Sequence, residues 1–368
     1  MKALQVIDKS FLGGGQTVVR YLVEGFRGTD VEPLLSCRDG GPLVDAVRDL
    51  GAPVLPLPFD KRFRPGPARA LARIAREQNV DVVHGHGLVA TFYCVLARRL
   101  FGLRAPILYH QHGFHHHNYG TLSRSARVAA EKWVCRQVER VIACSTMDRD
   151  QLAREGYARP ESVRLLYYGV PDPHPTDEQI RAAAAEAGLD PGHPVVGLVA
   201  RLHPQKGVDI FLRAAARVRE RRPDAKFVVV GGGELEDELH RLSKSLGLDG
   251  GLRWVGGRPS SPFLPLFTVN VLSSRWEGLP FTLLEAMASR KAIVTTDVPG
   301  CLDAVGPSEA SIVPRDDPDA LATATLDLLE HPERADAQAA AARRRYETAF
   351  TLSEMARRVE ELYVEVCR

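Results

Sequence analysis

Short apolar runs alternate with longer amphipathic segments along almost the whole chain. The apolar runs have the length and the Val, Ile and Leu content of buried strands, and the segments between them repeat their apolar positions with the period of a surface helix. Strands that alternate with helices predict βα units built on a parallel sheet. The predicted strands are residues 3–7, 31–36, 53–57, 80–84, 106–110, 140–144, 163–167, 195–200, 227–230, 252–255, 269–272 and 292–295.

The pattern is interrupted at residues 169–177, where the sequence GVPDPHPTD has the proline content of a linker. We therefore predict two doubly wound α/β domains, residues 1–172 and residues 173–351. A last helix, within residues 352–368, follows a complete second domain and has no strand of its own to cover. We expect it to cross back and pack on the first domain.

The composition agrees with two globular domains and narrows the function. A length of 368 residues lets each domain bury its own core. Hydrophobic residues make up 45% of the chain and charged residues 26%, as in an ordinary globular protein. The formal net charge of +2 lacks the basic excess of a dedicated nucleic-acid-binding protein, so we expect no nucleic-acid partner.

Cysteines and apolar runs bear on the compartment. The six cysteines lie far apart and include no CxxC pair, so we expect reduced thiols. The first apolar run is broken by Asp8 and Lys9, which indicates a core strand rather than a signal peptide. No run approaches the roughly 18 apolar residues that span a bilayer. These observations favour a cytoplasmic protein.

Three adjacent glycines, Gly13 to Gly15, separate the first predicted strand from a helix expected to begin near Gln16. Without side chains, their backbone amides can approach an anion bound at the start of that helix. The alternative is a tight turn with no ligand, and the spacing differs from the GxGxxG pattern of dinucleotide-binding folds.

Two cations follow the strand predicted at residues 195–200. In the run GLVARLHPQKG, Arg201 lies just past the strand and Lys206 at the expected start of the next helix. Cations are usually unfavourable at that end, because the helix dipole already makes it positive. A bound diphosphate would make both side chains favourable there. The alternative is two solvated surface charges.

Two acidic residues lie eight positions apart in the run SSRWEGLPFTLLEAMASRKA. Glu277 is expected in the loop after the strand at residues 269–272, and Glu285 on a helix that begins near Pro280. Both lie at the carboxyl edge of a parallel sheet, where open α/β folds bind ligands. Free amides at residues 281–283 would hold phosphate oxygens, while Glu285 accepts hydrogen bonds from sugar hydroxyls. The alternative for each acid taken alone is an ordinary exposed surface charge.

Several runs together carry a resemblance to a known family. They are GLVARLHPQKGVDIFLRA, VVVGGGELEDEL, GLRWVGG and EGLPFTLLEAMASRKAIVTTDVPG, and in the first domain GGGQ, HGHG, HQHG and VIACS in the expected order. The chain resembles the GT4 family of retaining, nucleotide-sugar-dependent glycosyltransferases of the GT-B fold. The resemblance implies two Rossmann-like domains facing across a cleft, with the donor bound mainly by the second domain and the acceptor mainly by the first.

The resemblance also implies a role for each matching residue. Arg201 and Lys206 match the pair that contacts the donor diphosphate. Glu285 matches the acid that holds the donor ribose, and Glu277 matches the acid near the hydroxyls of the donor sugar. The other matches are Gly14 and Gly15, which face the diphosphate, His112, which lies beside the anomeric centre, and the donor-binding run Gly278, Leu279, Pro280, Phe281, Thr282 and Leu283. The resemblance thus assigns catalysis to Arg201, Lys206, Glu277 and His112.

The chain departs from the family pattern at two places. It has Tyr168 and Gly169 where the family often has an Asn-Gly pair, and it has Cys301 and Asp303 where a second glycine and a glutamate are common. These differences fall on the expected sugar contacts and leave the diphosphate contacts intact.

Histidines are unusually dense in the first domain. His84 and His86 end one predicted strand, and His110, His112 and His115 to His117 surround the end of another. A metal site is one interpretation. The spacing lacks the regularity of a closed zinc site, and a glycosyl-transfer cleft uses histidines as hydrogen-bond donors and bases. The resemblance implies that basic residues and helix dipoles replace the metal, so we expect no metal and no cofactor.

A basic cluster with two aromatic residues spans residues 59–64 (FDKRFR) and continues at Arg69, Arg73 and Arg76. Contact with anionic lipid headgroups at the inner face of the membrane would bring a lipid-linked acceptor within reach. The alternative is an ordinary solvated helix face.

The expected reaction transfers a sugar from a nucleoside-diphosphate sugar to an acceptor hydroxyl, with retention of the anomeric configuration. The acceptor class stays open between a glycan, a lipid-linked sugar and a small molecule. Two alternatives remain. One is a GT-B enzyme that transfers nothing, such as a nucleotide-sugar epimerase, and the other is a two-domain sugar-binding protein.

Overall fold

The computed structural model describes residues 1–11, 13–59, 64–113, 121–190 and 192–368. They form two compact units, one of Met1–Gly169 with Leu352–Arg368 and the other of Val170–Thr351. The predicted boundary after residue 172 lies three residues beyond this division. Val170 already belongs to the second unit, because its amide donates to Phe350 O at 2.9 Å and its carbonyl accepts from Tyr346 Oη at 3.1 Å.

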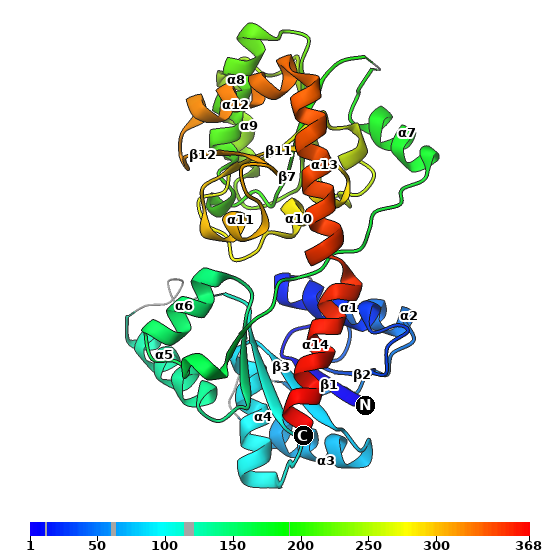
Figure 1. Ribbon diagram of the computed structural model, residues 1–368, viewed down its shortest axis with the longest axis vertical. Coiled ribbons are helices and arrows are strands. Elements are labelled where there is room, and N and C mark those ends of the chain that lie inside the picture. The colour runs from blue at the N-terminus through cyan, green and yellow to red at the C-terminus, as the bar shows by residue number, and fades with distance from the viewer. Residues whose placement is uncertain (12, 60–63, 114–120, 191) are drawn as a thin grey trace. The chain divides into compact units, whose positions relative to one another are not determined.

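The first unit is built on a parallel sheet with the strand order β2-β1-β3-β4-β5-β6 (Figure 1). Its strands lie within two residues of the predicted ranges and are β1 (Lys2–Ile7), β2 (Glu32–Ser36), β3 (Val82–His86), β4 (Ile107–Gln111), β5 (Arg140–Ala143) and β6 (Val163–Leu165). The strand predicted at residues 53–57 is wrong, since that segment forms only an isolated bridge between Val54 and Leu35. Leu55 N–H donates to Leu35 O and Leu57 N–H donates to Cys37 O, so the segment follows β2 without forming a regular strand.

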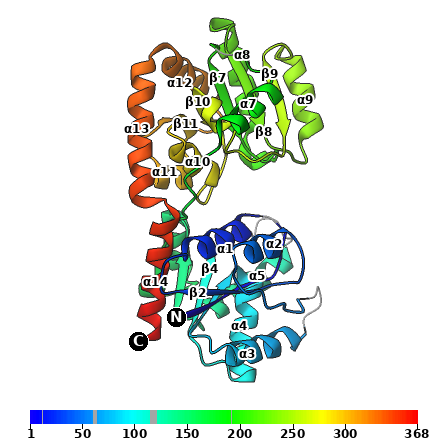
Figure 2. The ribbon, with the colours of Figure 1, turned by 90° about the vertical axis from the view of Figure 1, so that its right-hand side faces the viewer.

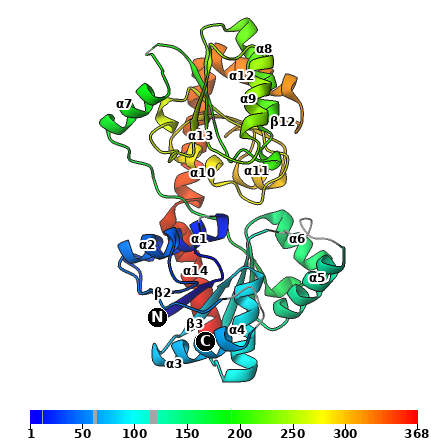
Figure 3. The same cartoon turned by 180° about the vertical axis from the view of Figure 1, so that it is seen from behind.

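Helices cover both faces of this sheet (Figure 3). They are α1 (Gly14–Gly25), α2 (Pro42–Asp49), α3 (Gly66–Glu77), α4 (Leu88–Phe101), α5 (Thr121–Cys135), α6 (Thr146–Arg154) and α14 (Leu352–Cys367). α3, α4 and α5 share an apolar core with Leu4, Val83 and Ile107 of the sheet. α14 packs against α1 so closely that a Cβ on Gly25 would lie 2.8 Å from Leu352 O. The last helix thus completes the unit that the first strand begins.

The second unit has the strand order β12-β11-β10-β7-β8-β9, again with parallel neighbours. Its strands are β7 (Val195–Val199), β8 (Lys226–Val230), β9 (Leu252–Gly256), β10 (Val269–Leu272), β11 (Ala292–Thr296) and β12 (Ser311–Val313). The sequence pattern missed β12, because its three residues are too short to show a period.

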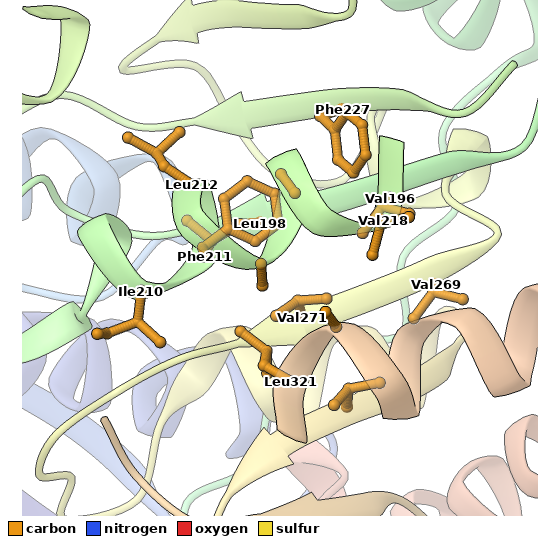
Figure 4. Close-up of a cluster of buried hydrophobic side chains, with 14 of the residues drawn as sticks. Val196, Leu198, Ile210, Phe211, Leu212, Val218, Phe227, Val269, Val271 and Leu321 are labelled. Atoms are coloured by element: carbon orange, nitrogen blue, oxygen red, sulfur yellow. The ribbon is translucent and has the colours of Figure 1, made fainter. Parts of the chain in front are cut away.

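The helices of the second unit pack around this sheet (Figure 2). They are α7 (Asp177–Glu186), α8 (Val208–Arg221), α9 (Glu236–Ser245), α10 (Phe281–Ala288), α11 (Pro299–Ala304), α12 (Pro318–Glu330) and α13 (Pro332–Ala349). α8, α9 and α12 bury one face, where Phe211 lies beside Leu198 and Phe227 (Figure 4). β7 and β10 are parallel neighbours, so the loops that follow them emerge at the same edge of the sheet.

Candidate active site

The loops that follow β7 and β10 are joined by an ion pair between Lys206 and Glu277. Lys206 ends a short 3-10 turn, η3 (Pro204–Lys206), and its Nζ donates to Glu277 Oε1 at 2.5 Å. The Lys206 side chain is 18% exposed and that of Glu277 only 6%. Ser274 Oγ also donates to Glu277 Oε1, at 2.7 Å, and Gln205 Nε2 lies 3.3 Å from Oε2. The structure therefore brings these two predicted residues into direct contact in a largely buried position.

Gly207 allows the two loops to approach. Its φ of +57° is favourable for glycine, and a Cβ there would lie 2.1 Å from Ser273 O. Ser273 Oγ in turn donates to Lys206 O at 3.1 Å. The backbone that carries Lys206 is thus fixed against the end of β10.

Arg275 ties the same loops together, and the sequence analysis missed it. Its guanidinium makes two hydrogen bonds to the Asp209 carboxylate, at 3.0 and 2.8 Å, and another to Asp316 at 2.6 Å. A bidentate ion pair of this kind fixes the orientation of the guanidinium as well as its distance from the carboxylate. The available signal was an acid three residues after Lys206 and an arginine two residues before Glu277. A pairing between such distant segments is not visible in a single sequence.

Arg201 lies two residues beyond β7 and is exposed. Within the described residues, its guanidinium has no protein partner, whereas its backbone is firmly held. A Cβ on Gly231 would lie 1.8 Å from Ala200 O, and a Cβ on Gly233 would lie 2.4 Å from Leu202 O. Only glycine permits these contacts. Arg201 therefore extends from a rigid turn at the same sheet edge as the Lys206 loop.

α10 begins at Phe281, with Pro280 extended at its N-cap. Leu283 N–H donates to Pro280 O at 3.1 Å. The prediction of a free amide at Leu283 is therefore wrong, because the first turn of the helix tightens and uses it. Phe281 and Thr282 are half-buried in that first turn.

The loop before α10 contains Gly278 and Leu279. Leu279 is 5% exposed and anchors the loop in the interior. A Cβ on Gly300 would lie 1.9 Å from Gly278 O, so the start of α11 packs directly on this loop. Next to that contact, burial raises the pKa of the Cys301 thiol to about 12, which keeps the thiol protonated. This cysteine is a packing residue of the site rather than a nucleophile.

Glu285 is the fifth residue of α10 and is half-buried. Its Oε2 accepts a hydrogen bond from Ser260 Oγ at 2.8 Å. This donor helps to orient the carboxylate on the first turns of α10.

In the first unit, the glycine run starts α1. Gly13 is extended at the N-cap and Gly14 is the first helical residue. The absence of positive φ at these three positions means that backbone conformation does not require glycine there. A Cβ on Gly15 would lie 3.1 Å from His112 Cδ2, whereas Gly14 has no atom within 4 Å of a built Cβ. Glycine at position 15 is explained by the close approach of α1 to His112.

One face of the first sheet has polar side chains at its centre. The register pairs Gln5 with His84 and His86 with His110, so these side chains share a face, and all are buried. The imidazole rings are stacked, with centroids 4.3 Å apart for His84 and His86 and 4.4 Å apart for His110 and His112. Burial lowers the pKa of His84 to about 3, and those of His86 and His110 well below the usual value. These three histidines are therefore neutral at physiological pH.

His112 is half-buried at the end of this stack and is held by two neighbours. Its Nε2 lies 3.1 Å from His86 Nδ1, and its Nδ1 lies 2.9 Å from Tyr168 Oη. Tyr168 is one of the departures from the family pattern, and here it contacts a predicted site residue. The sequence marked the position as unusual without indicating this partner.

The ring nitrogens of His84, His86 and His110 lie within 4.8 Å of one another, as a metal site requires. Nε2 of His84 and both ring nitrogens of His110 have no hydrogen-bond partner among the described residues. His86, by contrast, has both nitrogens in hydrogen bonds, to His112 and to Gln5 Oε1 at 2.9 Å. A shared metal ion would have to break that arrangement.

Some sequence expectations concern other parts of the first unit. His115 to His117 and residues 60–63 lie outside the described residues. Phe59 is buried against Tyr93, with ring centroids 5.5 Å apart, and so offers no aromatic surface to a membrane. Arg69, Arg73 and Arg76 form an exposed face of α3. Among the helices that the structure describes, none combines the length and apolar character needed to cross a membrane.

Comparison with known proteins places this arrangement in a class. The solved structure of Anabaena HepE in complex with UDP matches with a TM-score of 0.86 at 20% identity, covering 99% of this chain and 100% of that one. The two α/β units, each built on a parallel sheet, thus have the GT-B glycosyltransferase fold. The family model "Glycosyltransferase Family 4" matches residues 12–172, and "Glycosyl transferases group 1" matches residues 179–345. The chain belongs to the GT4-type glycosyltransferases, as the resemblance implied.

Two relatives of stated activity align over most of the chain. The alpha-D-kanosaminyltransferase of Streptomyces kanamyceticus is 29% identical over 85% of this chain and 88% of its own length. The UDP-Gal:alpha-D-GlcNAc-diphosphoundecaprenol alpha-1,3-galactosyltransferase of Escherichia coli is 28% identical over 72% of this chain and 71% of its own length. Both names describe the transfer of a sugar.

The buried histidines predict a loss of stability in acid. A histidine whose pKa falls from 6.5 to about 3 on folding binds a proton more tightly when unfolded. Its contribution is complete above pH 6.5 and is lost as the pH falls from 6.5 toward about 3. We expect the urea midpoint to drop between about pH 7.5 and about pH 5, and to drop less in His84→Gln. The exposed His193→Gln serves as the control, and a pH slope unchanged in His84→Gln would contradict this account.

The buried ion pair predicts non-additive stability effects. Lys206→Met leaves the Glu277 carboxylate buried without its cation, which should lower the free energy of unfolding by about 3 kcal/mol. The double variant Lys206→Met/Glu277→Gln buries no charge and should recover part of that loss. Urea denaturation followed by circular dichroism measures both. A double variant as unstable as the sum of its single variants would show that the two side chains are not coupled.

Proposed function

We propose that this protein is a retaining glycosyltransferase that transfers a sugar from a UDP-sugar to an acceptor hydroxyl. The observation that carries the proposal is the grouping of Arg201, Lys206 and the start of α10 on loops at one edge of the second sheet. Two cations and a helix N-terminus form a site for a dianionic leaving group. HepE was solved with UDP, and the Escherichia coli relative is named for UDP-Gal, which supports a uridine donor.

The second unit stabilises the leaving group. Cleavage of the bond between C1 of the sugar and the diphosphate oxygen leaves the electron pair, and hence the growing negative charge, on that oxygen. Lys206 is held by Glu277 and Ser273 before any ligand arrives, so it need not reorganise during the reaction. Removal of one such preorganised donor typically costs about 3 to 4 kcal/mol of transition-state stabilisation.

Glu277 has two functions in this proposal. Its Oε1 accepts from both Lys206 and Ser274, which orients the ammonium group. Among the described residues, its Oε2 has only a longer contact to Gln205, at 3.3 Å, and this is the oxygen that we assign to a hydroxyl of the donor sugar. The carboxylate thereby links the position of the cation to the position of the sugar.

Retention of configuration requires the new bond to form on the face that the diphosphate leaves. The acceptor oxygen bonds to C1, and its proton passes to the departing diphosphate oxygen, so charge and atoms balance without a protein base. We assign the acceptor to the first unit, with His112 as its reactive residue, and we keep Gly14 and Gly15 assigned to the donor diphosphate. Protein cations supply the neutralisation that a metal would otherwise supply, so the proposed reaction needs no metal.

Turnover tests the proposal. We expect UDP release from a UDP-hexose to continue in EDTA and to depend on an added acceptor, and to fall by about a hundredfold in Arg201→Ala and in Lys206→Ala. Lys244→Ala, an exposed lysine of α9, is the matched control. Circular dichroism verifies that each variant is folded.

Three results would contradict the proposal. Wild-type turnover in both folded variants would remove the diphosphate assignment. Loss of activity in EDTA with recovery on adding a metal would restore the histidine cluster as a metal site. Conversion of the UDP-sugar without any acceptor would favour an epimerase.

Glu285 is proposed to hold the donor ribose. Its carboxylate can accept hydrogen bonds from both ribose hydroxyls, and Glu285→Gln removes the charge that strengthens them. The loss is on the order of 1.5 to 3 kcal/mol, so affinity for UDP should fall by about tenfold or more. Calorimetry with UDP alone measures this, with the exposed Glu333→Gln of α13 as the control.

A different result would change the role of this residue. If Glu285→Gln binds UDP as tightly as the wild type but turns over no sugar, the ribose assignment is wrong and Glu285 acts on the reacting centre. If GDP, ADP or dTDP raises the thermal stability of the wild type more than UDP does, the uridine assignment is wrong.

A further inference from the structure

A continuous chain of hydrogen bonds runs from the last helix of the first unit to His112. Tyr363 of α14 accepts from Gln5 Nε2 at 2.9 Å, and Gln5 Oε1 lies 2.9 Å from His86 Nε2. His86 Nδ1 lies 3.1 Å from His112 Nε2. Gln5, His86 and Tyr363 are each 1% exposed or less, so water does not compete for these bonds. Whether each side chain donates or accepts therefore depends on which atom of its neighbour carries the hydrogen.

The direction of the chain follows from Gln5. Because its Nε2 donates to Tyr363, its Oε1 faces His86 and can only accept. His86 thus carries a hydrogen on Nε2. Burial lowers the pKa of His86 and keeps the ring neutral, so its Nδ1 is a bare acceptor. His112 Nε2, which faces that acceptor, must then be the donor.

We propose that Gln5 and Tyr363 are positioning residues for the reaction, because through His86 they fix a hydrogen on Nε2 of His112 and hold its ring in one orientation. The inference rests on the proposed function, in which His112 is the reactive residue of the first unit. His112 Nε2 is then committed to His86 and does not act as a base. A 180° turn of the Gln5 amide would reverse these bonds and put the hydrogen of His86 on Nδ1.

Tyr363 supports the amide in two ways. Its hydroxyl oxygen accepts from Gln5, and the hydroxyl lies 2.7 Å from His84 Nδ1. With Gln5 donating to the hydroxyl oxygen, the tyrosine hydrogen is directed to Nδ1 of the neutral His84 ring. The tyrosine ring is itself packed against Phe26, with centroids 5.9 Å apart. The hydroxyl that supports the Gln5 amide therefore comes from α14 and not from the strands β1 and β3.

The test combines spectroscopy with kinetics on the full chain. Two-bond proton–nitrogen spectra of protein labelled with 15N-histidine report which ring nitrogen carries the hydrogen, with His86 and His112 assigned by His86→Gln and His112→Gln. We expect the Nε2–H form for both in the wild type. Gln5→Met removes the acceptor, so both rings should populate two tautomers, and kcat for UDP release from the UDP-hexose turned over best should fall about tenfold while KM changes by less than about twofold.

Two matched variants separate positioning from structural support. Gln5→Glu keeps an oxygen facing His86 and should retain the Nε2–H forms and most of kcat. Tyr109→Phe removes another buried tyrosine hydroxyl of the same unit. This hydroxyl donates to Glu131 at 2.6 Å and takes no part in the hydrogen bonds between Tyr363 and His112. The substitution should alter neither the tautomers nor kcat, although it costs a hydrogen bond. Tyr363→Phe, by contrast, should mix the tautomers as Gln5→Met does.

The outcomes distinguish this inference from the proposed function. Unchanged tautomers in both Gln5→Met and Tyr363→Phe would overturn it, as would His112 with its hydrogen only on Nδ1 in the wild type. Mixed tautomers with unchanged kcat would also overturn it. Failure of the wild type to transfer sugar would instead refute the proposed function, and the spectra would still decide whether the chain fixes the tautomer.

Discussion

The ion pair between Lys206 and Glu277 is the interaction on which the second unit depends. A cation 18% exposed needs a nearby anion, and the glutamate that provides it comes from the loop after a different strand. The pair therefore forms only when the loops after β7 and β10 meet, which requires the close backbone contact at Gly207. Arg275, paired with Asp209 and Asp316, fixes the same junction from the side. The result is a charge whose place is set before a ligand binds.

The first unit solves a different problem, since it buries polar rings without burying charge. Desolvation keeps His84, His86 and His110 neutral, and stacking packs them as flat apolar faces. Gln5 is a partner for Nε2 of His86 and Tyr363 for Nδ1 of His84, whereas Nε2 of His84 and both nitrogens of His110 have no hydrogen-bond partner among the described residues. The second unit thus holds the charge of Lys206 in a fixed position, and the first unit holds buried side chains in hydrogen bonds. Both depend on groups brought together from distant parts of the chain.

The pattern of apolar residues along the chain predicted the features that depend on neighbouring residues in the sequence. Alternating apolar runs predicted the strands to within two residues, except at residues 53–57, which form only an isolated bridge, and at β12, which is too short. Arg201 and Lys206 were predicted as site residues because cations are unusual at a helix start, and Glu277 and Glu285 because both lie at the carboxyl edge of a parallel sheet. Arg275 and Tyr363 were missed, because their roles come from partners 66 and 358 residues away. Such contacts follow from packing, which one sequence does not display.

The return of α14 to the first unit has a consequence for synthesis. Gln5 and Tyr363 are hydrogen-bonded across a separation of 358 residues, and α1 is covered by a helix that follows the whole second unit. While the chain emerges from the ribosome, residues 170–351 are complete and can fold before the segment that closes the first sheet exists. The N-terminal residues are thus synthesised first, but the unit that they begin is completed last. Until then, the polar face of their sheet is open to water and to chaperones.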